Sequence, residues 1–457
     1  MAITRRQFVT RLGTLAAALG VSQVDLAKVT EAFAHGGAAG AWAGGAWTLK
    51  PKVVWVHGAE CTGCSTSLLG LFEDATGKAV EGTSITTLMA LDLSVGGDGT
   101  NKRVTPANGD GLTNHPYGHR TLNNSASVTG SDFDNSGNST TVAVNIADVL
   151  IDFIDLQYHE TVMGMGGELA YSVLHDNMHN ADHANAKPYV LVVEGAVQDK
   201  AQTGYWNETN TTYPWCSIGM NDAGTDELSF DDVVLDLANK SNCKAVVAIG
   251  QCASFGGYPA AVSPTLGASM TGAQSVYDFL CAHEAPAGSL SGKVINVPGC
   301  PTNPWWFILT VVLWLIDATS LLAGGSSVVG VLTTGLAIDP AAVDSTRRLK
   351  KVYGTSVHGP MCPRYQDFVN GRFATRPGAT GCLQLVGCKG PRTNSLCGLH
   401  GWNGQQPHND TTWDQSIAAF NQNGRYNRGG FCVSAGAPCM GCTEKGYPDS
   451  FVPFVVR

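Results

Sequence analysis

Cysteine is the residue whose number and spacing most directly suggest chemistry in this sequence. The chain of 457 residues has 14 cysteines, and eleven of them, with one histidine, divide into three groups of four. The first group is Cys61, Cys64, Cys252 and Cys300; the second is His358, Cys362, Cys382 and Cys388; the third is Cys397, Cys432, Cys439 and Cys442. Four is the number of protein ligands that a cubane iron–sulfur cluster needs, so the count indicates a series of electron-transfer sites.

The elements that must position the first group are short apolar runs typical of buried parallel strands. These runs are residues 53–56, 188–193, 244–249 and 293–297, and they alternate with segments of helical length. They predict an α/β fold with a doubly wound parallel sheet. Ligands bind beyond the carboxyl ends of the strands in such sheets, and the cysteines of the first group follow strands. Residues spread over 240 positions can therefore meet at one edge.

Composition sets the frame for these sites. A hydrophobic content of 44% in 457 residues is enough for one large core or two smaller ones. The net charge of −9 and the absence of a basic block argue against nucleic acid as a partner, because binding to phosphates needs clustered Lys and Arg.

Two regions differ in composition from the rest of the chain. Between residues 96 and 141, 27 of 46 residues are Gly, Asn, Ser or Thr, which predicts a surface insertion; a binding surface is the functional alternative. From about residue 340 onward Gly, Pro, Asn and Cys dominate and aliphatic runs disappear. A segment so poor in core residues needs another source of stability, and metal ligation supplies it because binding free energy becomes folding free energy.

The N-terminus has the features of an export signal. Residues 4–9 contain Arg5 and Arg6, a mildly apolar stretch covers 12–21, and small residues at 32–34 suit a cleavage site. This predicts export by the twin-arginine route, which carries folded, cofactor-loaded proteins. The alternative is an amphipathic helix with two chance arginines.

No transmembrane helix is expected in this chain. The apolar stretch 304–316 ends at Asp317, well short of the roughly 20 residues that a span requires. We expect a buried core helix there, so that attachment to a membrane needs a partner.

Eight segments, in order along the chain, carry a resemblance to a known family. They are Glu60–Ser65, Tyr158–Thr161, Val193–Ala196, Cys252–Gly257, Pro298–Pro301, Cys362–Arg364, Gly387–Pro391 and Ala435–Cys442. Through them the chain resembles the small, electron-transferring subunit of a nickel–iron hydrogenase of the exported uptake type, over most of residues 50–449.

The resemblance implies an architecture and partners. It implies a signal and extension in residues 1–49, a flavodoxin-like domain in 50–340 with the proximal cluster, and an irregular domain in 341–457 with the medial and distal clusters. The nickel–iron site belongs to a separate large subunit, and this chain relays electrons from hydrogen oxidation to an external acceptor. The external acceptor would be a cytochrome or a membrane b-type haem. The expected location is the periplasm or the outer face of the cytoplasmic membrane, and the assembly could be a dimer of heterodimers.

The resemblance also assigns the three groups of ligands. The first group matches the proximal 4Fe–4S cluster, the second the distal 4Fe–4S cluster and the third the medial cluster. Cys432 stands where many members have a proline and a three-iron cluster. A fourth thiolate completes a cubane, so we expect a medial 4Fe–4S cluster, with a free cysteine beside a 3Fe–4S cluster as the alternative.

Three features depart from the family pattern or distinguish between variants of the family. His358 and Cys362 are one residue further apart than the usual HxxC spacing, which leaves a non-ligating His358 as an alternative. Gly63 and Gly257 stand where oxygen-tolerant members carry two extra cysteines, so the ordinary four-cysteine proximal cluster is expected. Thr66 replaces a common glutamate, while Glu60 and Glu194 are expected to be structural.

Other functions remain open from the residues alone. An even number of cysteines suits a disulfide-stapled exported protein, and CxxC pairs suit structural zinc. A cluster subunit of a quinone- or coenzyme-reducing complex would share the N-terminal half. The ungrouped Cys216, Cys243 and Cys281 are expected to pack as small buried hydrophobic residues.

Overall fold

The computed structural model describes thirteen stretches of the chain. They are residues 52–69, 155–180, 189–199, 215–221, 224–262, 271–304, 306–307, 310–311, 333–334, 337–338, 342–359, 362–400 and 431–448. The export signal expected in 1–49 and the insertion expected at 96–141 lie outside these residues and stay predictions.

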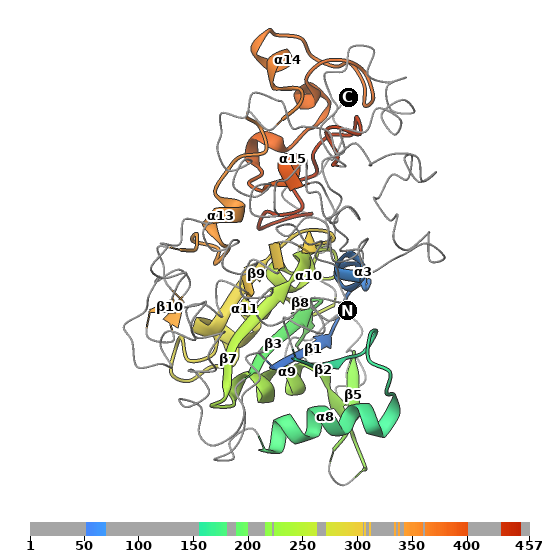
Figure 1. The fold of residues 1–457 in the computed structure, drawn as a ribbon, viewed down its shortest axis with the longest axis vertical. Helices are drawn as coiled ribbons and strands as arrows, with labels where there is room; N and C mark the ends of the chain where they lie inside the picture. Colours follow the sequence, from blue (N-terminus) through green and yellow to red (C-terminus); the bar gives the residue numbers. More distant parts are fainter. Residues whose placement is uncertain are drawn as a thin grey trace, which may run out of the picture.

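A five-stranded parallel sheet forms the centre of the N-terminal part (Figure 1). Its strands are β1 (Lys52–His57), β2 (Asp155–His159), β3 (Tyr189–Glu194), β7 (Cys243–Ile249) and β9 (Val294–Val297). They are arranged in the order β2-β1-β3-β7-β9, which becomes 2-1-3-4-5 when the sheet strands are counted along the chain. This is the flavodoxin-like order of a doubly wound sheet, so the predicted fold class is confirmed.

Four of these strands coincide with the four predicted apolar runs. The sequence does not predict β2, because its residues Asp-Leu-Gln-Tyr-His lack the β-branched run of a buried strand. Instead, β2 is held at the edge by its register with β1, in which Val53 pairs with Leu156 and Trp55 with His159.

Both faces of the sheet are covered, as a doubly wound fold requires. One face packs against α8 (Gly167–Asn180), α9 (Phe230–Asn239) and α11 (Val276–His283), whose apolar residues join those of the strands in one core. On the other face, the ring of Trp55 lies 5.2 Å from that of Phe307.

The apolar stretch expected to form a core helix does so where it is described. Residues 304, 306, 307, 310 and 311 are helical, and Trp306, Phe307 and Val311 are buried. Across the stretches of chain that the structure describes, none of the helices combines the length and apolarity needed to cross a membrane.

Shorter elements complete the N-terminal part. They are α3 (Gly63–Leu69), α10 (Gly250–Phe255), the 3₁₀ turn η4 (Ser291–Lys293) and the paired short strands β4 (Val197–Gln198) with β8 (Ala273–Gln274), β5 (Ser217–Met220) with β6 (Glu227–Ser229), and β10 (Thr333–Thr334) with β11 (Ala337–Ile338). The two short helices α3 and α10 directly follow β1 and β7, and each carries a cysteine of the first group.

The described C-terminal residues have only short regular elements, as the composition predicts. These are α13 (Lys350–Tyr353), α14 (Tyr365–Val369), α15 (Cys397–His400) and the 3₁₀ turns η5 (Leu383–Val386) and η6 (Gly390–Arg392). In Figure 1, α14 lies at the end of the molecule furthest from the sheet. A small apolar cluster forms here, in which cysteines contribute alongside Val357, Leu383, Phe431 and Val433.

Arg348 fastens the C-terminal segments to one another and to the N-terminal part. Its buried guanidinium forms ion pairs with Asp344 at 2.8 Å and with Glu444 at 3.0 Å, and it donates to the carbonyl of Thr443 at 2.7 Å. The side chain of Gln251, in α10, donates to the carbonyl of Glu444 at 2.9 Å. The last segment is thereby fixed against the helix that carries Cys252.

We predict that Arg348→Ala weakens folding by about 3–5 kcal/mol, because it removes a buried guanidinium and leaves two partly buried carboxylates without their cation. Urea unfolding of the purified protein measures the change. Lys240→Ala is the control, since its ion pair with the half-exposed Asp236 should contribute about 0–1 kcal/mol. Equal losses in the two variants would contradict the role given to Arg348.

Candidate metal centres

The first group of cysteines gathers at the carboxyl edge of the sheet, as predicted. Cys61 and Cys64 follow β1, Cys252 lies in α10 after β7, and Cys300 follows β9. Burial raises the pKa of Cys252 to about 12, and the nearby thiols of Cys300 and Cys61 add to the shift. The edge between β1 and β3 is where the strand order reverses, the usual ligand position of a doubly wound sheet.

Glycines let the backbone approach these sulfur atoms closely. Gly250 has a φ of +85°, and a Cβ atom on it would lie 2.5 Å from Sγ of Cys64. Gly257 has a φ of +53°, and its Cβ would lie 3.0 Å from Sγ of Cys252. Glycine is therefore required at Gly250 both for the left-handed backbone and for the space.

A carboxylate at the end of β3 holds the Cys61–Cys64 loop in place. Oε1 of the buried Glu194 accepts hydrogen bonds from the backbone amides of Cys64 at 2.9 Å and Ser65 at 3.1 Å, at the start of α3. Its Oε2 accepts from Oγ of Ser65 at 2.6 Å and from Nε1 of Trp55 at 3.2 Å. A negative group at a helix N-terminus is favourable, so Glu194 fixes the helix that carries Cys64.

The loop itself contains a strained residue. Thr62, between the two cysteines, has a φ of +58°, which is unusual for a β-branched side chain. The amide and the hydroxyl of Thr66 both donate to the carbonyl of Thr62, at 2.9 and 2.8 Å. Thr66, the position that departs from the family pattern, thus stabilises this turn.

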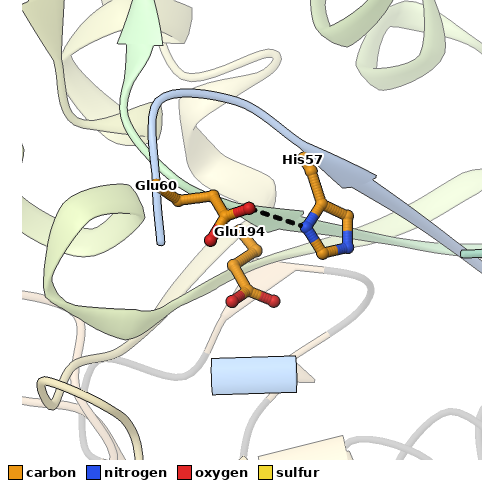
Figure 2. A group of neighbouring side chains, drawn as sticks. All are labelled: His57, Glu60 and Glu194. Carbon is orange, nitrogen blue, oxygen red and sulfur yellow. Dashed lines mark hydrogen bonds and ion pairs between the residues drawn. The ribbon is translucent and has the colours of Figure 1, made fainter. Parts of the chain in front are cut away.

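His57, Glu60 and Glu194 lie together beside the loop (Figure 2), with one ligand atom from each within 4.8 Å of the others. Nδ1 of His57 is 3.1 Å from Oε1 of Glu60, and its other ring nitrogen points away from both carboxylates. Burial lowers the pKa of His57, but the hydrogen bond to Glu60 and the neighbouring carboxylates outweigh this and raise it. Because Glu194 already accepts four hydrogen bonds, the trio is a hydrogen-bonded support and not a cation site.

His159 extends this support. Its Nδ1 accepts the amide hydrogen of Thr161 at 3.2 Å, and its Nε2 lies 3.0 Å from Oγ of Ser65. Burial and the neighbouring His57 lower the pKa of His159 to about 3, so the ring is neutral and Nε2 donates to Ser65. Ser65 in turn donates to Glu194, so His159 supports the Cys61–Cys64 loop through Ser65.

The second group meets in the C-terminal part. Burial raises the pKa of Cys362 to about 12, with further contributions from Cys388 and Cys382. A Cβ on Gly390 would lie 3.5 Å from Sγ of Cys388 and 3.7 Å from Cβ of His358, so this histidine adjoins the cysteines. The structure therefore brings all four residues together despite the unusual spacing of His358.

The ring of His358 is oriented by aromatic neighbours. Its centroid lies 5.3 Å from that of Tyr365 and 4.5 Å from that of Phe368, both in edge-on contacts. Nε2 is buried and has no hydrogen-bond partner among the described residues. Burial lowers the pKa of His358, which favours the neutral ring that binds metal.

The third group is the most deeply enclosed. Burial raises the pKa of Cys442 well above its ordinary value, and the thiols of Cys397, Cys432 and Cys439 add to this. The hydroxyl of Ser395 donates to Sγ of Cys397 at 3.1 Å. Cys432 therefore lies with the other three cysteines, as the sequence predicts.

The three groups form a row. The amide of Cys439 donates to Sγ of Cys388 at 3.3 Å, which joins the third group to the second. Cys442 and Cys300 belong to one small apolar cluster with Tyr447, which joins the third group to the first. The third group therefore lies between the other two.

Tyr353 lies between the first and third groups. It is fully enclosed, and its hydroxyl donates to the carbonyl of Pro298 at 2.8 Å. Burial raises its pKa well above the ordinary value, and the thiols of Cys397, Cys442 and Cys64 add to the shift. No sequence motif marks this residue, because its position depends on how the two parts of the chain dock.

The cysteine sulfur atoms form no disulfides, and within each group they are further apart than the ligands of a zinc ion. All fourteen cysteines lie within the described residues, and none forms a disulfide. A tetrahedral zinc site would hold its sulfurs about 3.8 Å apart, given Zn–S bonds of about 2.3 Å. In the described chain, however, no group of three cysteine or histidine ligand atoms from these sites lies within 4.8 Å of one another. A cubane separates its ligands more widely, since each binds a different iron, so the residues fit clusters better than zinc.

The three cysteines outside the ligand groups differ in burial. Cys243 is buried in the sheet, and the half-buried Cys216 packs against the same core, as expected. Cys281 is exposed on α11, so its predicted burial was wrong. The sequence pattern fails there because α11 presents one side to solvent.

Two family models match the chain. Residues 136–314 match the NADH ubiquinone oxidoreductase 20 kDa subunit, and residues 353–412 match the C-terminal domain of the NiFe/NiFeSe hydrogenase small subunit. The first match covers much of the sheet, and the second begins just before the second cysteine group and ends after Cys397.

Relatives match over nearly the full length. The chain is 27% identical to the periplasmic NiFeSe hydrogenase small subunit of Desulfomicrobium baculatum, covering 100% of this chain and 99% of that protein. It is 25% identical to the periplasmic NiFe hydrogenase small subunit 1 of Nitratidesulfovibrio vulgaris, over 99% and 93% of the two chains. A solved NiFeSe hydrogenase from Desulfovibrio vulgaris Hildenborough superimposes with a TM-score of 0.55 at 26% identity, covering 90% of this chain and 100% of that one.

We predict that Gly250→Ala removes the metal of the first group, about four irons per chain. The new Cβ would meet Sγ of Cys64 in a backbone conformation that alanine disfavours. Iron analysis of purified protein measures the loss. Gly292→Ala is the control, because a Cβ there has no neighbour within 4 Å; the same iron content in both variants would contradict the prediction.

Proposed function

We propose, on the premise that this chain belongs to the family of nickel–iron hydrogenase small subunits, that it carries electrons between a hydrogen-activating large subunit and an external carrier. The observation that carries this proposal is the row of three ligand groups. The row is joined by the packing of Cys300 against the cluster of Cys442 and Tyr447 and by the hydrogen bond from the amide of Cys439 to Sγ of Cys388. A row of sites is what stepwise transfer across a protein needs.

Each group would hold one iron–sulfur cluster. The proximal ligands would be Cys61, Cys64, Cys252 and Cys300; the medial ligands Cys397, Cys432, Cys439 and Cys442; and the distal ligands His358, Cys362, Cys382 and Cys388. Clusters bound there would supply one-electron transfer. The raised pKa values of the unliganded thiols mean that cluster binding must release protons, so retention of iron should weaken in acid.

The residues of the chain would keep this row dry and fixed. Glu194 anchors the proximal loop, Tyr353 fills the space between the proximal and medial groups, and Arg348 holds the last segment against the sheet domain. Each hydrogen molecule that the large subunit oxidises yields two protons and two electrons, so two one-electron carriers must be reduced in succession.

The family match in the C-terminal part distinguishes this function from related ones. The match of residues 136–314 is to a subunit of a quinone-reducing complex and would suit that function as well. The match of residues 353–412 is to the hydrogenase small subunit. The hydrogenase function is therefore the better supported of the two.

Export to the periplasm is part of the proposal. Both of the relatives described above are named as periplasmic, which supports the twin-arginine signal proposed from Arg5 and Arg6. A large subunit would have to travel with this chain, since the route carries folded complexes.

Cys432 is proposed as the fourth medial ligand. Cys432 is partly buried, and its thiol helps to raise the pKa values of Cys442 and Cys397. A free cysteine beside a three-iron cluster would not need to adjoin the other three thiols.

We predict that Cys432→Ala converts the medial cluster to a three-iron form. EPR of the oxidised protein should then show a three-iron signal that the unchanged protein lacks, with a loss of about one iron per chain. The same substitution at the exposed Cys281 should change neither quantity. A three-iron signal already present in the unchanged protein would contradict the role of Cys432.

We also predict that Cys388→Ala interrupts the relay at its outer end. Reduction of an external acceptor by hydrogen should fall at least tenfold, about 1.4 kcal/mol or more of lost transition-state stabilisation. Exchange between deuterium gas and water, which needs only the large subunit's site, should be retained. Cys281→Ala is the matched control, and unchanged acceptor reduction in Cys388→Ala would contradict the proposed route.

A further inference from the structure

Charge is divided unevenly along this chain. Residues 341–457 contain thirteen Lys and Arg against six Asp and Glu, a formal charge of +7. Residues 1–340 contain fifteen Lys and Arg against 31 Asp and Glu, a formal charge of −16. The net charge of the whole chain is −9, but its C-terminal part, which contains the distal group, is therefore positively charged.

The segment around the distal group is basic at its surface. Residues 362–392 contain five Lys and Arg and one acid, Asp367, which is a formal charge of +4. Asp367 is buried and paired with Arg372 at 2.7 Å, so no carboxylate of this segment faces the solvent. Arg364 points inward to backbone carbonyls, whereas Arg376 and Arg392 are exposed.

Two large apolar side chains of the same segment are also exposed. Val369 is 58% exposed at the end of α14, next to Phe368, whose ring contacts His358. Leu385 is 63% exposed in η5, between Cys382 and Cys388. We call Val369, Arg372, Arg376, Leu385, Lys389 and Arg392 the distal patch.

We propose that the distal patch is the docking surface of a soluble electron-carrier protein with an acidic face. Exposed apolar residues near the exit of the relay, in a segment (362–392) whose one acid is buried, fit the small interfaces of transient electron-transfer complexes. Opposite charge would steer the carrier to this end of the molecule, which Figure 1 shows furthest from the acidic sheet domain. This inference rests on the electron-relay function proposed above.

An anionic membrane surface would also attract cations, but the patch suits a protein better. Binding in the plane of a membrane uses an extended amphipathic helix, and α14, the helix of this patch, is five residues long. Among the described residues of 362–400, two large apolar side chains are exposed, Val369 and Leu385, which is little area for insertion into lipid.

The test uses the complex with its large subunit, without hydrogen for binding and with hydrogen for reduction, and two forms of one probe. The probes are basic cytochrome c and the same protein succinylated on its lysines, which is acidic. Binding to the immobilised complex, measured by surface plasmon resonance without hydrogen, should favour the acidic form at least tenfold at low salt, and the preference should fade as salt rises. Reduction rates should follow the same order.

Charge-reversal variants test whether the acidic probe binds at the distal patch. Arg376→Glu with Arg392→Glu should lower the affinity for the acidic probe at least tenfold. The control is Lys350→Glu with Lys445→Glu, an equal change of charge at a cavity beside Ser275 and Asn296 of the sheet domain, and it should lower the affinity less than threefold.

Three results would overturn the docking proposal: tighter binding of the basic probe, equal effects of the two double variants, or binding to vesicles of phosphatidylglycerol without any preference for the acidic probe. Reduction of a small uncharged dye by hydrogen tests the electron relay without the docking surface, so it distinguishes failure of the docking proposal from failure of the relay. If the dye is reduced but the acidic probe is not preferred, only the docking proposal fails. If hydrogen reduces neither, the relay fails.

Discussion

The packing of Cys300 against the apolar cluster that Cys442 forms with Tyr447 is the interaction on which the rest of the structure depends. The first residue follows strand β9, the second lies near the end of the chain, and they share an apolar cluster with Met440 and Tyr447. This contact sets where the irregular C-terminal part lies relative to the sheet. Arg348 and Gln251 fix the same junction through Glu444, and Tyr353 fills the space beside it.

The C-terminal part shows why ligand residues must also be structural. The α-helices described in this part are four or five residues long, too short to be stable alone, and several of its cysteines form part of its small apolar cluster. Ligation of iron would add the free energy that a larger core supplies elsewhere. The sheet domain has a large apolar core of its own. Folding should therefore depend on metal binding more strongly in the C-terminal part than in the sheet domain.

The sequence predicts elements that depend on local pattern and misses those that depend on docking. The four apolar strands and the strand-end positions of Cys61, Cys252 and Cys300 follow from runs and spacing. By contrast β2, the bond network of Glu194 and the position of Tyr353 require partners distant in the chain. Cys281 was misjudged because residue type alone does not tell which side of α11 faces solvent.

The most direct test of the central claim is the iron and acid-labile sulfide content of the anaerobically purified protein, with EPR of its oxidised and reduced forms. Three cubane clusters predict about twelve irons and about twelve sulfides per chain, without a three-iron signal on oxidation. Zinc in place of iron, or cysteines paired as disulfides, would contradict the account of a row of electron-transfer sites.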